Sequence, residues 1–111
     1  MQVKAVFHID EKIKWRLVIN NIKNLLSDLD EYQVLVVANA DAVREYIQDE
    51  SVFSQELAEL TQHRVRLCAC RNALNGHQIK EEDIFAFVDI VPVGIKEIVQ
   101  KQLEGYAYIK P

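Results

Sequence analysis

The most reactive side chains in this sequence are two cysteines, Cys68 and Cys70, one residue apart. A cysteine thiolate attacks sulfur and carbon electrophiles, so a cysteine becomes a candidate nucleophile where its surroundings favour the anion. Cys70 ends an apolar run that is predicted to be a strand, and a helical turn is expected around Asn72. Backbone N–H groups at the start of a helix favour an anionic sulfur. Cys70 is therefore the main candidate for a reactive thiol, against the alternative that it is a packing residue, as most buried cysteines are.

Cys68 is predicted to face the same side of the strand as Cys70, because alternate side chains of a strand share a face. We expect Cys68 to pack under a helix, and a second possibility is that it resolves an oxidised or persulfidated Cys70. No second cysteine pair completes a tetrahedral zinc site, so we expect no bound metal. The histidines His63 and His77 belong to surface-like segments and are expected to be solvated.

Other polar side chains follow the predicted strands, at the edge where ligands bind in open α/β sheets. His8 is suited to exchange a proton with a thiol, or it makes an ordinary backbone hydrogen bond. Asn39 and Asn72 either contribute to a site or shape their own turns. Arg71 would add positive charge beside Cys70. The four places where strands end are residues 8–10, 39–41, 70–72 and 92–94.

The elements that must position these residues alternate between strands and helices. Short, almost continuously apolar runs predict strands over residues 3–9, 33–38, 65–70, 87–91 and 106–109. Apolar residues at three- and four-residue spacing, and short polar stretches, predict helical segments over 12–29, 41–48, 51–63, 80–84 and 95–103. Ser51 is the expected N-cap of the third of these helices. Trp15 is expected either at a helix edge or in a subunit contact.

Helical segments between successive strands serve as the crossover connections that parallel strands require. The sequence therefore predicts an α/β fold with a mostly parallel sheet of about five strands and helices on both faces. The 111 residues, with 50% hydrophobic and 27% charged content, are expected to form one compact domain spanning residues 1–111.

Charge and targeting signals exclude several classes of partner. A net charge of −4 offers no basic surface for nucleic acid or anionic lipid. We find no secretory signal and no apolar run approaching the roughly 20 residues that cross a bilayer. Two cysteines make no disulfide framework. We therefore expect a cytoplasmic protein with reduced thiols that binds neither nucleic acid nor membrane.

The motifs of several common activities are absent from the sequence. No GxxxxGK[ST] or GxGxxG loop follows the first predicted strand, so nucleotide and dinucleotide cofactors lose support. A response-regulator phosphorylation site would need Asp where Cys70 stands, and no G-x-S-x-G nucleophile motif occurs. We expect no cofactor.

Several short motifs resemble those of the DsrE/DsrF-like family. They are His-Ile-Asp-Glu-Lys at residues 8–12, Ala-Asn at 38–39, VRLCACRNAL at 65–74, Val-Pro-x-Gly at 91–94, and the ending EGYAYIKP. The resemblance extends over essentially the whole chain. Its more specific parts are the Ala-Cys-x-Asn block that contains Cys70 and the Glu-Gly-Tyr-Ala-Tyr-Ile ending.

The resemblance implies a three-layer α/β/α domain with a YchN-like fold that assembles into homotrimers or homohexamers. It also implies a role in sulfur relay, in which a cysteine accepts sulfur as a persulfide from a donor and passes it to a partner protein. By position this cysteine is Cys70. Relay members carry theirs in a similar region but a different local sequence, so Cys68 remains a second counterpart.

Two functions follow from the sequence. The first is a persulfide-carrying sulfur-relay protein, and the second is a non-catalytic oligomeric binding module of the same fold. Tyr106, Tyr108 and Ile109 would form an apolar terminal strand that is poorly suited to an exposed edge, which also favours a homo-oligomer.

Overall fold

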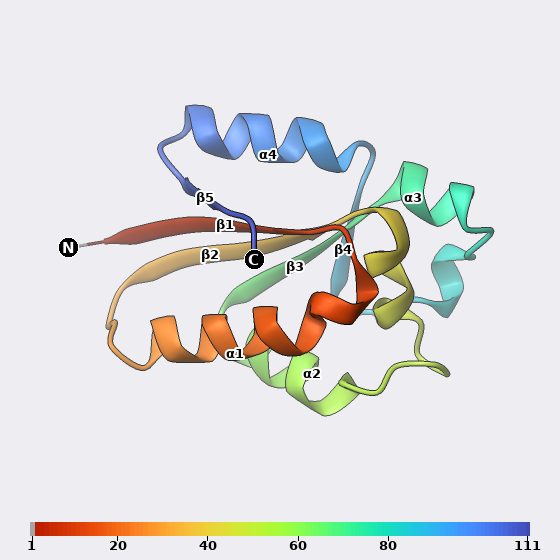
Figure 1. The fold of residues 1–111 in the computed structure, drawn as a ribbon, viewed down its shortest axis with the longest axis horizontal. Helices are drawn as coiled ribbons and strands as arrows, with labels where there is room; N and C mark the ends of the chain where they lie inside the picture. Colours follow the sequence, from red (N-terminus) through yellow and green to blue (C-terminus); the bar gives the residue numbers. More distant parts are fainter. Residues whose placement is uncertain (1) are drawn as a thin grey trace.

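Five parallel strands form one sheet in the order β4-β3-β2-β1-β5, drawn in Figure 1. The computed structural model describes residues 2–111; Met1, the first residue of the predicted domain, lies outside them. The predicted α/β fold with a five-stranded parallel sheet is confirmed. The strands are β1 (Val3–Ile9), β2 (Tyr32–Ala38), β3 (Val65–Cys70), β4 (Val88–Val91) and β5 (Ala107–Ile109).

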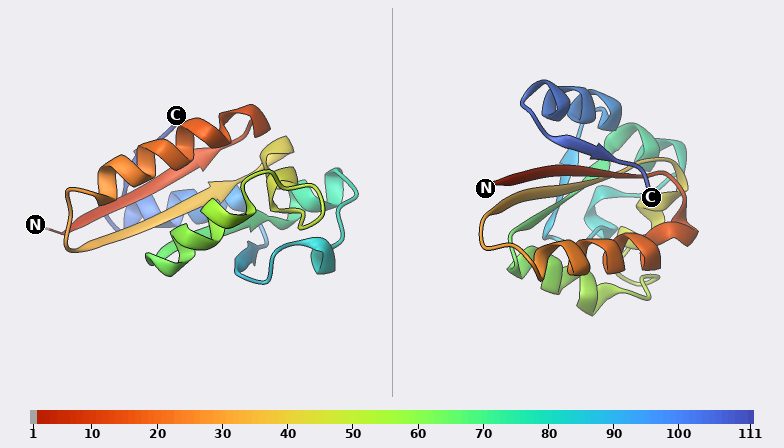
Figure 2. Two further views of the ribbon diagram at one scale, coloured as in Figure 1. Left: turned by 90° about the horizontal axis from the view of Figure 1, so that it is seen from below. Right: turned by 60° about the vertical axis from the view of Figure 1, so that its left-hand side comes forward.

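Helices cover both faces of the sheet, α1 and α2 on one side and α4 on the other (Figures 1 and 2). The central strands β1, β2 and β3 are therefore buried on both faces, which is why their sequences are almost continuously apolar. The helical elements are η1 (Lys12–Lys14), α1 (Trp15–Leu26), η2 (Ala40–Tyr46), α2 (Ser54–Gln62), α3 (Arg71–Gly76), η3 (Glu81–Asp83) and α4 (Gly94–Leu103).

The larger of two apolar clusters lies between the sheet and the helices α1 and α2. Trp15 is fully buried in it, packs edge-on against Tyr46 with the ring centres 5.2 Å apart, and donates its indole N–H to the Ala42 carbonyl at 2.9 Å. Trp15 is thus a core residue of the chain itself, and the subunit contact considered for it is wrong. A partner for the indole N–H is what permits such deep burial.

A smaller cluster lies between the other face of the sheet and α4. It consists of Val6, Leu35, Val37, Cys68, Val91 and Ile98, with Tyr106 packed against it. Only one helix covers this face, so the apolar layer is thinner there, and the carboxyl ends of the strands come close to the start of α4.

The segment before α2 departs from the prediction. Ser51 is not the N-cap of α2, because the helix begins three residues later. The reason is the buried carboxylate of Glu45, which accepts hydrogen bonds from the Ser51 hydroxyl at 2.7 Å and from the backbone N–H groups of Val52 and Phe53. These bonds hold residues 51–53 in a loop. In place of the helical segment expected over 41–48, the chain forms the tighter 3₁₀ helix η2 over residues 40–46.

Within residues 2–111, no helix combines the length and the apolar character that a membrane crossing requires.

Candidate functional site

Both cysteines are free and lie on the α4 face of β3, as the alternation of strand side chains predicted. Cys68 is completely buried in the smaller apolar cluster. Burial raises the pKa of the Cys68 thiol to about 12, against a smaller opposing effect of the Arg66 guanidinium. Cys68 is therefore protonated near neutral pH and a poor nucleophile.

Cys70 is the last residue of β3 and the residue from which α3 starts, and 6% of it is exposed. The start of a second helix, α4, also lies close to Cys70. A Cβ atom built on Gly94 would lie 3.1 Å from the Cys70 Cβ and 3.6 Å from its Sγ. The first turn of this ten-residue helix therefore packs directly against the thiol, and unpaired backbone N–H groups of such a turn favour a negative charge.

Gly94 lies at one of the four predicted strand ends, but the sequence analysis did not single it out as a site residue. The missing side chain lets the backbone of α4 approach Cys70 and Val37, whose Cγ1 would lie 3.2 Å from an added Cβ. The signal was present in the Val-Pro-x-Gly turn, since a glycine at the start of a helix after a strand often marks a close approach. It did not reveal which strand the glycine approaches.

His8 connects two elements through its imidazole ring, which is almost buried. Its Nε2 lies 3.0 Å from the Asn39 Oδ1 and its Nδ1 lies 2.7 Å from the Tyr108 hydroxyl oxygen. A side-chain carbonyl only accepts, so Nε2 donates to Asn39, and in the neutral ring Nδ1 then accepts from the Tyr108 O–H. His8 therefore makes two side-chain hydrogen bonds rather than the backbone hydrogen bond considered from the sequence.

Tyr108, the second missed residue, comes from the other end of the chain. It reaches His8 because β5 pairs with β1 at the edge of the sheet. The ion pair between Lys110 and Asp10, at 3.0 Å, holds the same two segments together, and the Lys110 hydrogen bond lowers the pKa of Asp10. The sequence signal for Tyr108 was limited to its place in a terminal strand.

Asn39 and Cys70 each come directly after the last residue of a paired segment on two adjacent strands. The last paired residues of β2 and β3 are Ala38 and Ala69, and Asn39 and Cys70 follow them directly. Asn39 keeps an extended backbone and donates its N–H to the Ile9 carbonyl at 3.1 Å, which continues the sheet ladder by one residue. The two side chains therefore share the α4 face of the sheet.

Arg71 and Asn72 lie on the first turn of α3. The Arg71 guanidinium is paired with the Glu81 carboxylate of η3 at 2.8 Å, and Asn72 is exposed. His63 is exposed and His77 is half-buried. Across residues 2–111, no cluster of three or more His, Cys, Asp or Glu side chains is arranged to hold a metal ion.

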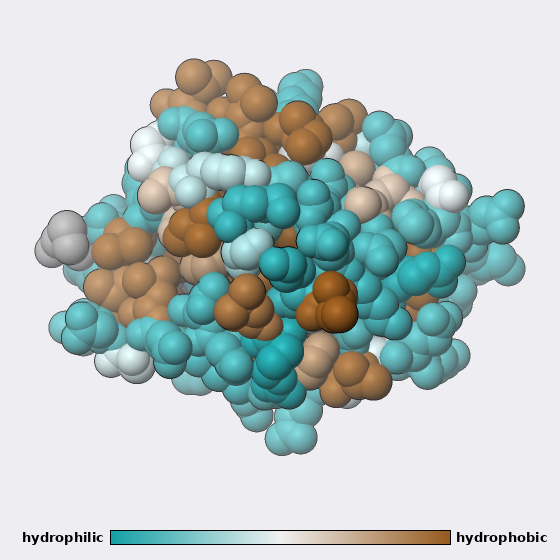
Figure 3. Space-filling model, viewed as in Figure 1, coloured by the Kyte–Doolittle hydropathy of each residue, from teal (hydrophilic) through white to brown (hydrophobic). Residues whose placement is uncertain are grey.

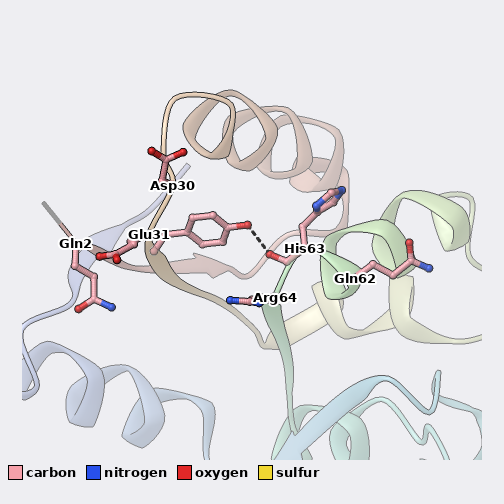
Figure 4. A pocket seen from close by; sticks show the side chains of 7 residues that line it. Gln2, Asp30, Glu31, Gln62, His63 and Arg64 are labelled. Atoms are coloured by element: carbon pink, nitrogen blue, oxygen red, sulfur yellow. Dashed lines mark hydrogen bonds between the residues drawn. The ribbon is translucent and has the colours of Figure 1, made fainter.

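A cleft of about 540 Å³ lies at the opposite edge of the sheet, where β2 and β3 begin (Figure 4). Within its lining the Tyr32 hydroxyl donates to the His63 carbonyl at 2.7 Å. The lining is mostly polar and contains neither cysteine, so the carboxyl edge with Cys70 is the better candidate for chemistry. The cleft is lined by Gln2, Asp30, Glu31, Tyr32, Gln62, His63 and Arg64.

Comparison with known proteins agrees with this fold. The model of the DsrE/DsrF-like family matches residues 3–111. Among solved structures, the chain is similar to the protein of unknown function MTH1491 from Methanobacterium thermoautotrophicum, with 38% sequence identity and a TM-score of 0.92 over 98% of this chain and 99% of that chain. No curated protein matches the chain. Because the family model covers nearly every residue, the chain belongs to the DsrE/DsrF-like family.

Proposed function

We propose that this chain is a single-domain sulfur-relay protein that carries sulfur as a persulfide on Cys70. One observation supports it above the others: the Cys70 sulfur lies 3.6 Å from the position of a Cβ on Gly94, in the first turn of α4. Backbone N–H groups of that turn are hydrogen-bond donors for a sulfur anion, whereas burial raises the pKa of the Cys68 thiol to about 12. The motif resemblance also assigns the sulfur-carrying role to Cys70.

The proposed reaction transfers one sulfur atom without net oxidation. The Cys70 thiolate attacks the terminal sulfur of a donor persulfide, so that a new S–S bond forms while the donor's S–S bond breaks and the donor leaves as a thiolate. An acceptor thiolate then attacks the terminal sulfur on Cys70 in the same way and regenerates the Cys70 thiolate. In each step one thiolate is consumed as the nucleophile and another is released as the leaving group. No electrons are gained or lost, so no redox cofactor is required.

The partners of such a protein are a sulfur donor, a sulfur acceptor and further copies of this chain. Two free cysteines suit the cytoplasm, where thiols stay reduced. Assembly into a homotrimer or homohexamer is supported by the exposed apolar side chains Ile95, Val99 and Leu103, which recur every four residues along α4. In Figure 3 apolar residues gather at the top of the view, where α4 lies.

Mass spectrometry of the intact protein tests the sulfur chemistry. Reduced protein incubated with a low-molecular-weight persulfide is expected to gain one sulfur atom, about 32 Da, in a form that dithiothreitol removes. The variant Cys70→Ser should not gain mass, and the matched variant Cys68→Ser should gain it as the wild type does. Equal labelling of Cys70→Ser would contradict the proposal.

The second candidate function is an oligomeric binding module without sulfur chemistry. The small exposed fraction of Cys70 favours it, since a residue that is only 6% exposed offers a sulfur donor little access. In that case neither cysteine takes up sulfur, and Cys70→Ser changes the free energy of unfolding without changing any reaction. The mass experiment therefore separates the two functions.

A further inference from the structure

The orientation of the Asn39 side chain is set by His8. The Asn39 Oδ1 is occupied by the Nε2–H of His8 at 3.0 Å, so the two N–H groups of the Asn39 amide remain for other acceptors. The Asn39 oxygen requires the proton of His8 on Nε2, and the Tyr108 O–H, 2.7 Å from Nδ1, donates to the other ring nitrogen and stabilises the same tautomer. Tyr108 therefore supports, through His8, the orientation in which the N–H end of the Asn39 amide is free.

The register of β2 and β3 brings the free end of Asn39 toward the position of Cys70. The two residues continue the paired strands β2 and β3 by one position and share the α4 face. Ala40, the next residue, has a left-handed backbone with φ of 50°, a conformation that costs a residue with a Cβ about 1 kcal/mol or more. The chain keeps this strained turn directly after Asn39, where it ends the extended backbone of β2.

We propose that Asn39 is a positioning residue that donates an amide hydrogen bond to the anionic sulfur of Cys70, and that Tyr108 and His8 orient it for this task. The inference rests on the proposed function, because the acceptor is the Cys70 thiolate and then the terminal sulfur of its persulfide. Asn39 supplies a donor from the β2 side, and the first turn of α4 supplies donors from the side of Gly94. The anion lies between them.

Replacing Asn39 by aspartate reverses this interaction with almost no change in shape. A carboxylate has no N–H to donate and places a negative charge beside the sulfur, so the thiolate is disfavoured. Tyr108→Phe keeps the aromatic ring and removes the hydroxyl that stabilises the Nε2–H tautomer of His8 by donating to Nδ1. It is the milder variant, and its ring is partly exposed, so the fold tolerates the change.

The test measures the alkylation rate of Cys70 by iodoacetamide at neutral pH in the full-length protein. Fragmentation of the tryptic peptide spanning residues 67–71 assigns the label to Cys70 or Cys68. Asn39→Asp should slow the labelling of Cys70 by about tenfold or more, and Tyr108→Phe by a smaller factor of about two to five. Asn75→Asp, an exposed change of the same charge on α3, is the matched control and should leave the rate unchanged.

Nitrogen-15 NMR of the histidine rings provides a second measurement, the tautomer of His8. This tautomer would not change if Tyr108 had only a structural role. In the wild type the neutral His8 ring should carry its proton on Nε2, and Tyr108→Phe should shift protons toward Nδ1, while His63 and His77 keep their spectra. If Asn39→Asp labels at the wild-type rate, or if Tyr108→Phe changes the His8 tautomer without slowing Cys70, the proposal is wrong. If Asn39→Asp does not fold, Tyr108→Phe decides alone.

Iodoacetamide requires no sulfur donor, so this test is independent of persulfide loading. A wild type that never gains sulfur but shows the predicted order of alkylation rates would refute the relay function and keep the role of Asn39. If the wild type gains sulfur on Cys70 but all variants are alkylated at the same rate, the relay function stands and the role of Asn39 is refuted.

Discussion

The thiols of Cys68 and Cys70 lie on the same face of β3, only two residues apart, yet their surroundings differ. Cys68 lies within the sheet, where apolar side chains and α4 exclude water on every side. Cys70 lies at the carboxyl edge, where apolar packing gives way to the starts of two helices. The same side chain is therefore a core residue at one position and a candidate nucleophile at the other.

The buried thiol of Cys68 should make the protein less stable in alkali. In the unfolded chain its pKa returns to the ordinary value near 9, so the unfolded state loses this proton first and stability falls as the pH rises from 9 toward 12. By pH 10 the wild type should have lost about 1.4 kcal/mol that a Cys68→Ala variant does not lose.

Urea unfolding of both proteins at pH 7, 8, 9 and 10 measures this difference. Above pH 10 both proteins should lose further stability, because burial raises the pKa of Tyr46 well above its ordinary value and this phenol ionises first in the unfolded chain. Parallel pH dependences in the wild type and Cys68→Ala between pH 8 and 10 would show that Cys68 is not buried as described.

Glu45 shows why a residue-level prediction failed before α2. A glutamate in a stretch of helical character is normally assigned to the solvent face, yet this carboxylate is 1% exposed and accepts three hydrogen bonds from residues 51–53. Burial of its charge is compensated by donors that come from a later loop. Local sequence patterns contain no such information.

At the scale of elements, α4 is positioned by a glycine at each end. Gly94 allows its close approach to β2 and β3. Gly105, with φ of 95°, ends it: its N–H donates to the Gln102 carbonyl and the N–H of Tyr106 donates to the Lys101 carbonyl. This pair of hydrogen bonds is the Schellman motif, and it turns the chain back toward β5. Both ends of α4 therefore lead into residues of the candidate site.

Alanine at Gly94 should destabilise the protein, because the added Cβ would meet Cys70 and Val37 at 3.1 and 3.2 Å. We expect a loss of about 1–2 kcal/mol, as for other insertions into packed regions. Gly76→Ala is the matched control: its Cβ meets nothing within 4 Å and alanine favours the helical conformation, so stability should rise by about 0.5 kcal/mol. Thermal and urea unfolding measure both, and changes of the same sign would contradict the close approach.

At the scale of the whole molecule, the two faces of the sheet are covered unequally. Two helices cover the larger core, whereas α4 alone covers the smaller cluster and exposes Ile95, Val99 and Leu103. The edge strand β5 adjoins α4 in sequence and is only three residues long. A second copy of the chain packed on α4 would bury this apolar stripe.

Light scattering at micromolar concentration tests the assembly. We expect a mass of three or six times the 12.8 kDa of the chain. Val99→Glu places a charge in the middle of the α4 stripe and should shift the mass toward the monomer. Val52→Glu, an exposed apolar residue outside α4, is the control and should leave the mass unchanged. A wild type that is strictly monomeric would contradict the proposed oligomer.

The type and approximate bounds of most elements were predictable because they depend on local composition. The strands β1 and β3 match their predicted ranges, since apolar residues in unbroken runs have few other stable arrangements. Element ends were less predictable, and α2 starts later than expected because of Glu45. Trp15, expected at a helix edge or in a subunit contact, is buried in the core because a carbonyl from η2 accepts its indole N–H.

What the sequence by itself determined was the parallel α/β architecture, the family, and the placement of Cys70 at a strand end. These follow from apolar periodicity and short motifs, which act between residues close along the chain. Only the tertiary structure decided that Gly94 lies against Cys70, and that Tyr108 reaches His8 one hundred residues away. Those contacts depend on strand order and on the packing of α4. Both are determined by interactions throughout the core, and no single segment of the sequence contains them.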